Sequence, residues 1–238
     1  MLNCKVFENL DQAAAACAER ITSSLRDAVT KDGRAAIAVS GGSTPKPLFR
    51  CLADANLPWG RVHVFWADER MVPPEHPESN FRLAWENWLS KVAIPEENLH
   101  RIKGELPPQR AAEEYASELK AFFGGPPHFD VLHLGMGADG HTASLFPCVE
   151  GAVHSDGLAH AFWIPKLRAW RVSLTAAALR SAKNTLVLVA GADKAETLCR
   201  VFRQQANPEE LPIALLAGAS NVRWYVDASA GRQLGLPH

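Results

Sequence analysis

Residues 129–147, FDVLHLGMGADGHTASLFP, contain the pattern that decides the fold of this chain. The apolar run from Phe129 to Leu134 predicts a buried strand, and the glycine-rich segment after it predicts a tight turn. In open α/β sheets, ligands bind beyond the carboxyl ends of the strands. We therefore expect a sheet that presents Asp139 and His141 at its rim. The alternative is a glycine turn that only ends a core strand.

Strand and helix patterns alternate along the rest of the chain, which is typical of an α/β fold with a mostly parallel sheet and helices on both faces. Strands are expected at 4–7, 34–40, 61–66, within 94–102, at 160–164, 170–174, 185–190, 213–216 and 222–226. Helices are expected at 9–33, from Pro45 with Thr44 as the N-cap, after a cap at Ser79 or Asn80, at 107–123 and at 175–181. The segment 191–198 is expected to be a turn that opens a further helix. The large apolar residues of the third helix, among them Trp85 and Trp88, are assigned to the core. We expect one domain, 1–238, with a possible small lobe at about 148–175.

Composition excludes several classes of protein. The 238 residues are 47% hydrophobic and carry 25 basic against 26 acidic side chains, without a basic run, so nucleic acid is not expected as a partner. No export signal or apolar stretch of membrane-spanning length is apparent, so no membrane partner is expected. The five cysteines are scattered, which argues against a disulfide framework and a zinc site. We expect a cytoplasmic monomer or small homo-oligomer.

The turn SGGSTP at 40–45 is the second segment with chemical character. Free N–H groups at a helix N-terminus attract anions, and a glycine pair lets a ligand approach the backbone closely. Gly41, Gly42, Ser43 and Thr44 are therefore candidates to hold a phosphate. The segment lacks the Gly-Lys-Ser/Thr ending of a P-loop. It also lacks the third glycine and the later acidic residue of a dinucleotide-binding fingerprint. An ordinary strand-to-helix turn explains it about equally well.

Charged residues follow the third predicted strand in the run WADER at 66–70. Arg70 offers a planar fork that suits a phosphate or a carboxylate. Its alternative is a surface ion pair with Asp68 or Glu69, which would contribute little. Lys194 is expected in the first turn of a later helix, where a cation is unfavourable unless an anion compensates it.

Five motifs in order carry a resemblance to the 6-phosphogluconolactonases: 40–45, 66–70 with Ser79 and Asn80 downstream, 134–147, 171–175 and 191–194. The resemblance implies a Rossmann-like (NagB-like) α/β fold shared with the glucosamine-6-phosphate isomerases. It also implies hydrolysis of a sugar-phosphate lactone, 6-phosphogluconolactone, in the oxidative pentose phosphate route, with no cofactor and no metal.

Two other functions remain open. Isomerases similar to this chain carry a glutamate where Phe146 stands and a tyrosine where Arg70 stands, whereas Asp68 matches their enolising aspartate. A sugar-phosphate sensor on the same fold would usually bring a DNA-binding segment, and none is seen. We rank lactonase first, isomerase second and sensor third.

The mechanism expected from the sequence uses His141 as the base that activates water, with Asp139 to orient its imidazole. Backbone amides of the 135–140 turn are candidates for stabilising the oxyanion. The candidate substrate- and phosphate-binding residues are Gly41, Gly42, Ser43, Thr44, Arg70, Asn80, Arg171 and Lys194. The histidines on predicted strands, His63, His133 and His160, are interpreted as structural. Ser144 is not surrounded by the turn that a serine nucleophile requires.

Overall fold

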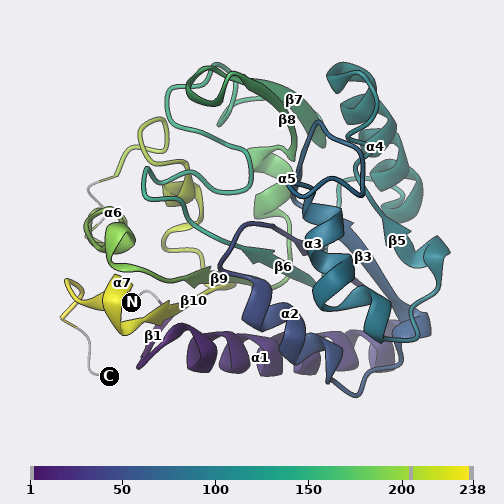
Figure 1. Ribbon diagram of the computed structural model, residues 1–238, viewed down its shortest axis with the longest axis horizontal. Coiled ribbons are helices and arrows are strands. Elements are labelled where there is room, and N and C mark those ends of the chain that lie inside the picture. Colours follow the sequence, from purple (N-terminus) through teal and green to yellow (C-terminus); the bar gives the residue numbers. More distant parts are fainter. Residues whose placement is uncertain (1–2, 204–205, 236–238) are drawn as a thin grey trace.

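A seven-stranded parallel sheet forms the centre of the protein, whose computed structural model describes residues 3–203 and 206–235 (Figure 1). Every paired neighbour in this sheet runs parallel. The order of the strands is β1 (Asn3–Phe7), β10 (Val222–Asp227), β9 (Thr185–Val189), β6 (Val131–Leu134), β2 (Ala35–Val39), β3 (Val62–Trp66) and β5 (Leu99–His100). The predicted α/β class with a mostly parallel sheet is confirmed.

Helices lie on both sides of this sheet, with α1 and α2 below it and α4 and α5 above it in Figure 1. The helices are α1 (Leu10–Asp32), α2 (Lys46–Ala53), α3 (Asn80–Asn87), α4 (Pro108–Phe123), α5 (Ala176–Arg180), α6 (Ala195–Phe202) and α7 (Ala228–Gly231). Shorter 3-10 turns cover Trp59–Arg61, Leu89–Lys91, Glu96–Asn98, Pro165–Leu167, Ala192–Lys194 and Pro212–Leu216. None of the helices in the described ranges is long and apolar enough to cross a membrane.

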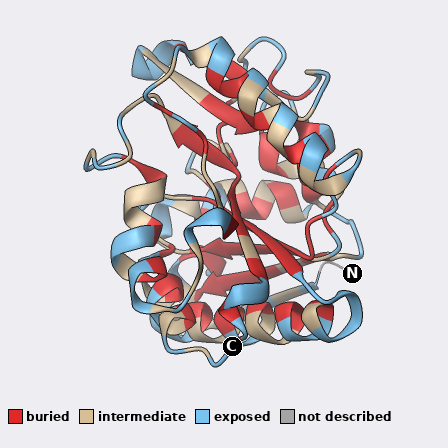
Figure 2. Ribbon diagram, turned by 90° about the vertical axis from the view of Figure 1, so that its right-hand side faces the viewer, coloured by how far each residue is buried: buried red, intermediate tan, exposed pale blue. Residues whose placement is uncertain are grey.

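Local sequence explains where the elements begin and end. The side chain of Asn9 caps α1 by accepting from the Gln12 N–H, and Gly33 ends the helix in the left-handed conformation at φ 75°. Strands β2, β6 and β9 are buried along their whole length, because helices cover both faces of the sheet. Figure 2 shows this burial concentrated in the central strands.

A second, antiparallel sheet stands beside the first and consists of β4 (Asp68–Arg70), β8 (Ala169–Leu174) and β7 (Ala159–Ile164). The pair β7 and β8 confirms the strands predicted near 160–164 and 170–174. Strand β4 follows β3 after the single residue Ala67. The charged residues that follow β3 therefore form a strand of the small sheet, in which Arg70 lies opposite Arg171. A separate lobe at about 148–175 stays a prediction.

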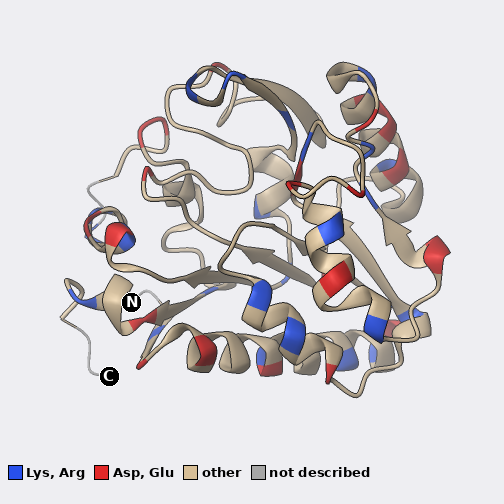
Figure 3. Cartoon of the chain, in the orientation of Figure 1, with Lys and Arg blue, Asp and Glu red and all other residues tan. Residues whose placement is uncertain are grey.

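Basic and acidic residues, which are nearly equal in number, are mixed over the surface (Figure 3). Figure 3 shows Lys and Arg interspersed with Asp and Glu along the outer surfaces of the helices. The strands of the large sheet carry few charged residues over their central stretches, because both faces are buried.

Three sequence expectations were wrong. Helix α2 begins at Lys46 and the backbone turn before it has no side-chain cap, so Thr44 does not act as its N-cap. The apolar run 213–216 lies in a 3-10 turn instead of a strand, and its buried residues Ile213 and Leu216 are three apart. Trp85 is 43% exposed, whereas Trp88 is fully buried.

Candidate active site

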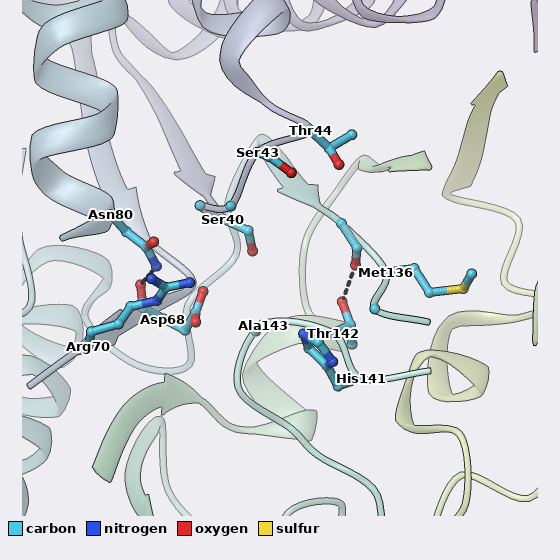
Figure 4. A pocket seen from close by; sticks show the side chains of 14 residues that line it. Ser40, Ser43, Thr44, Asp68, Arg70, Asn80, Met136, His141, Thr142 and Ala143 are labelled. Carbon is cyan, nitrogen blue, oxygen red and sulfur yellow. Dashed lines mark hydrogen bonds between the residues drawn. The ribbon is translucent and has the colours of Figure 1, made fainter. Parts of the chain in front are cut away.

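A cavity of about 180 Å³ opens where the carboxyl ends of β2 and β6 meet the start of β4 (Figure 4). It has three walls: the turn after β2, the loop after β6, and residues of β4 and α3. Its lining comprises Ser40, Gly41, Gly42, Ser43, Thr44, Asp68, Arg70, Asn80, Gly135, Met136, Gly137, His141, Thr142 and Ala143. The location agrees with the general rule for parallel sheets.

The first wall is the turn between β2 and α2. Gly42 adopts φ 99°, which favours glycine. A Cβ at Gly41 would lie 1.8 Å from Asn80 Oδ1, so only glycine lets that amide approach the turn. Ser43 and Thr44 both line the cavity, and the Ser40 hydroxyl is buried without a partner among residues 3–203 and 206–235. The hydroxyls of these residues can contact a ligand in the cavity.

The second wall holds a histidine and carboxylate pair. His141 Nδ1 lies 2.5 Å from Asp139 Oδ1, and the backbone of Gly137 passes so close that a Cβ there would meet His141 Nδ1 at 2.1 Å. When Nδ1–H donates to the carboxylate, Nε2 carries the lone pair of the neutral ring. His141 lines the cavity, whereas Asp139 lies behind it and does not. The arrangement suits a base oriented from behind.

The imidazole also packs against its own loop, and the neighbouring residue is hydrogen-bonded. The His141 ring stacks on the Phe146 ring with centroids 4.2 Å apart. Next to it, Thr142 Oγ1 donates to the Gly135 carbonyl at 2.9 Å, as Figure 4 shows. The stacking on Phe146 restricts the rotation of the His141 ring.

Burial lowers the pKa of His141 below its ordinary value of 6.5. The negative charge of Asp68 acts against this decrease, and the positive charges of Arg70 and Lys194 add to it. The ring is therefore neutral at pH 7 and able to accept a proton.

The third wall is fixed by carboxylates that the sequence analysis did not assign to the site. Asp68 is buried and accepts from Ser144 Oγ at 2.7 Å, and its carbonyl accepts from Asn80 Nδ2 at 2.9 Å. Glu69 accepts from the backbone N–H of Asn80 and of Phe81, each at 2.8 Å, and so holds the start of α3. Burial raises the pKa of Glu69 to about 7.

Two arginines stand side by side at this wall. Arg70 lines the cavity and donates from Nη1 to the Glu78 carbonyl at 2.8 Å, while its buried Nε has no partner among residues 3–203 and 206–235. Arg171 is its cross-strand neighbour, and burial together with the charge of Arg70 lowers the pKa of Arg171. Like charges in this position are unfavourable, and the carboxylates of Asp68, Glu78 and Glu69 act against the decrease in the pKa of Arg171. The pair therefore suits a phosphate.

The structure gathers most of the predicted residues at one cavity. Seven of them line it: Gly41, Gly42, Ser43, Thr44, Arg70, Asn80 and His141. Arg171 lies beside Arg70 outside the lining, and Lys194 forms an ion pair with Asp193 in the 3-10 turn Ala192–Lys194. No three His, Cys, Asp or Glu side chains in the described parts of the chain gather closely enough to hold a metal ion.

Several residues at or near the cavity were missed, among them Thr142 and Ala143 of the lining. Asp68 and Ser40 stand at strand ends, and that position alone was a signal for both. Lys166 contacts Asp139 from the turn between β7 and β8, and no sequence motif marks it.

Comparison with known proteins agrees with the family resemblance seen in the sequence. A family model described as "Glucosamine-6-phosphate isomerases/6-phosphogluconolactonase" matches residues 8–224. A 6-phosphogluconolactonase of Synechocystis sp. is 39% identical over 219 residues, which are 90% of each chain. The crystal structure of a 6-phosphogluconolactonase from Thermotoga maritima superposes with a TM-score of 0.85 at 29% identity and covers 95% of this chain and 100% of that one.

A monomeric glucosamine-6-phosphate deaminase of the NagB superfamily shares the fold, with a TM-score of 0.82 at 16% identity over 97% of this chain and 99% of that one. The predicted Rossmann-like, NagB-like architecture is thereby confirmed. The chain therefore belongs to the glucosamine-6-phosphate isomerase and 6-phosphogluconolactonase family.

Proposed function

We propose that this protein hydrolyses 6-phospho-D-glucono-1,5-lactone to 6-phosphogluconate in the oxidative pentose phosphate pathway, with His141 as the base that activates water. The observation that carries the proposal is the Asp139 and His141 pair directed at a cavity whose other walls offer a helix N-terminus and Arg70. The relatives' names support the same reaction. A cytoplasmic enzyme, monomeric or a small homo-oligomer and without a cofactor, remains our prediction.

The proposed chemistry begins with water between His141 Nε2 and the lactone carbonyl. The water oxygen bonds to the carbonyl carbon while its proton passes to Nε2, and Asp139 stabilises the imidazolium that forms. The bond between the carbonyl carbon and the ring oxygen then breaks, and the ring oxygen takes the proton from Nε2. The base is thereby restored and the open acid is released.

The developing oxyanion needs donors, and the expected backbone amides are only partly available. Gly137 N–H donates to the His141 carbonyl at 2.9 Å, and Gly140 N–H donates to the Gly137 carbonyl at 2.9 Å. These two amides already have partners, so we assign the role to the N–H groups of the other two lining residues of this turn, Gly135 and Met136.

The phosphate is proposed to bind at the turn Gly41 to Thr44 and at Arg70, with Arg171 and Lys194 adding positive charge nearby. The hydroxyls of Ser43 and Thr44 suit phosphate oxygens. Asn80, held by Glu69 and Asp68, would contact the substrate between the phosphate and the base. Anchoring the remote phosphate fixes the reacting carbonyl against His141, which is a large source of acceleration.

The isomerase alternative is favoured by Asp68, a carboxylate in the cavity where an enolising base would stand. Phe146 argues against it, because an aromatic ring stacks on His141 at the position where isomerases place a glutamate. We therefore keep isomerase activity as the comparison in the test.

The test measures decay of freshly generated 6-phosphogluconolactone with and without the protein, since the lactone also hydrolyses unaided. Glucosamine 6-phosphate is assayed in parallel by ammonia release. We expect excess lactone decay in the wild type, its loss in His141→Ala and no ammonia. Ammonia release without excess lactone decay would establish the isomerase instead, and silence in both assays would leave a sensor.

A further inference from the structure

Lys166 reaches the candidate base from a different part of the fold. It belongs to the 3-10 turn Pro165–Leu167 that joins β7 to β8, and Arg168 closes this turn in the left-handed conformation at φ 48°. Its Nζ contacts Asp139 Oδ2 and lies 4.7 Å from the centre of the Phe146 ring. Through Lys166 the turn between β7 and β8 therefore reaches the loop after β6.

Both partners of Lys166 are direct neighbours of His141. Asp139 uses Oδ1 for His141 and Oδ2 for Lys166, so its two carboxylate oxygens are divided between the base and the lysine. Phe146 stacks on the imidazole and also faces the ammonium. Lys166 and Asp139 both lie outside the lining of the cavity. The lysine can thus act on the base through these two residues.

We propose that Lys166 is a positioning residue that fixes the Asp139 carboxylate against His141 and partly neutralises its charge. The inference rests on the proposed function in one respect, that His141 is the base. With the ammonium in place, one carboxylate oxygen is held toward Nδ1–H and the carboxylate cannot rotate away. With the charge partly neutralised, the imidazole keeps a lower proton affinity and stays in the form that accepts a proton.

The other charges around His141 set the background for this effect. Asp68 and Arg70 face it from β4 and Lys194 from the turn Ala192–Lys194, in addition to Asp139 in its own loop. Removal of Lys166 leaves the Asp139 carboxylate unopposed beside the ring. An unopposed negative charge favours the imidazolium, so the pKa of His141 should rise and activity should be lost at a higher pH.

The alternative is a surface ion pair without consequence, because the Lys166 side chain is 53% exposed and such pairs contribute little to stability. The chain offers a matched control in Lys103, which is 50% exposed and lies 3.0 Å from Glu114, a carboxylate as exposed as Asp139. That pair lies away from the cavity lining. If Lys166 positions Asp139, its removal should change the pKa of His141, whereas removal of Lys103 should not.

The experiment compares wild type, Lys166→Met, Lys166→Arg and Lys103→Met. The pKa of His141 is followed by NMR titration of its ring signal, assigned with His141→Gln, and kcat/KM for the lactone is measured against pH. Lys166→Met should raise the pKa of His141 by roughly 0.2 to 0.7 units, the size expected of one exposed charge pair. The acid limb of the kcat/KM profile should shift equally, while Lys166→Arg and Lys103→Met should match the wild type.

The titration needs no substrate, which separates this inference from the proposed function. A raised pKa in Lys166→Met together with no excess lactone decay in the wild type would refute the lactonase and leave the positioning role standing. An active wild type in which Lys166→Met and Lys103→Met give the same His141 pKa and the same profile would overturn the positioning role.

Discussion

The large parallel sheet and the small antiparallel sheet contribute different things to the cavity. The large sheet ends in two glycine-rich turns, one with hydroxyls after β2 and one with His141 after β6. The small sheet supplies charge: Asp68 and Arg70 from β4, Arg171 from β8 and Lys166 from the turn between β7 and β8. The comparison teaches that the proposed base comes from the large sheet, whereas the charged part of the proposed phosphate anchor, Arg70, comes from the small sheet.

Burial explains this division. Strands of the large sheet are covered on both faces and tolerate chemistry only where they end. Strand β8 is only partly buried from Ala169 to Arg171, so it can carry an arginine within its length. A charged group can therefore be placed along the small sheet, whereas the large sheet places reactive groups in turns.

The largest expected effect comes from removing the proposed catalytic base, His141, which follows β6 of the large sheet. His141→Ala should lower kcat about 10²- to 10⁴-fold, the usual contribution of a general base, and leave KM nearly unchanged. Steady-state kinetics on the lactone would show it, with His160→Ala on the partly exposed strand β7 as control. Near-normal turnover in His141→Ala would remove it from the role of base.

The second largest effect is expected from removing Arg70 of the small sheet. Arg70→Ala should raise KM roughly ten- to a hundredfold, because a charge-assisted hydrogen bond to phosphate contributes about 1.5 to 3 kcal/mol. The value of kcat at saturation should change far less. Arg82→Ala is the control, since Arg82 pairs with Glu86 on the exposed side of α3. An unchanged KM would make Arg70 a structural residue bound to the Glu78 carbonyl.

A smaller effect is expected where the two sheets meet. Gly41→Ala brings a Cβ to 1.8 Å from Asn80 Oδ1, so Asn80 has to move. We expect a loss of about 1 to 3 kcal/mol in the free energy of unfolding, as for other overpacked sites, together with weaker substrate binding. Urea denaturation measures the first quantity. Gly60→Ala is the control, because a Cβ there meets nothing within 4 Å. Equal stability of the two variants would show that the turn and Asn80 are not tightly coupled.

The smallest effect is expected in the pH dependence of kcat/KM. Because burial lowers the pKa of His141, the neutral base persists below pH 6.5, and kcat/KM should begin to fall only at lower pH. Below that pKa the rate should drop about tenfold per pH unit. A pH profile of kcat/KM checks this. A midpoint above 6.5 would mean that the carboxylates outweigh burial and the nearby cations.

Much of the fold and the site could be predicted because the signals are local. The spacing of Asp139 and His141 among glycines indicated a turn that brings the two side chains together, and they are in contact. The long run of helical spacing before Gly33 likewise predicted α1. Patterns of this kind need no knowledge of the rest of the chain.

The failures involve short patterns or distant partners. Trp85 and Trp88 are three residues apart, as on one helix face, but α3 ends at Asn87 and Trp88 leaves the helix at φ −145°. Their different burial follows from that ending. Lys166 meets Asp139 only because the two sheets pack together; it lies 27 positions after Asp139, and the intervening sequence carries no signal for that contact.

The most direct test of the division between the two sheets is calorimetric binding of the product, 6-phosphogluconate, to His141→Ala and to Arg70→Ala. We predict that His141→Ala binds it within about threefold of the wild type, and that Arg70→Ala binds it at least about tenfold more weakly, since only the latter loses a charged contact to phosphate. The opposite pattern, with binding lost in His141→Ala and retained in Arg70→Ala, would contradict the account.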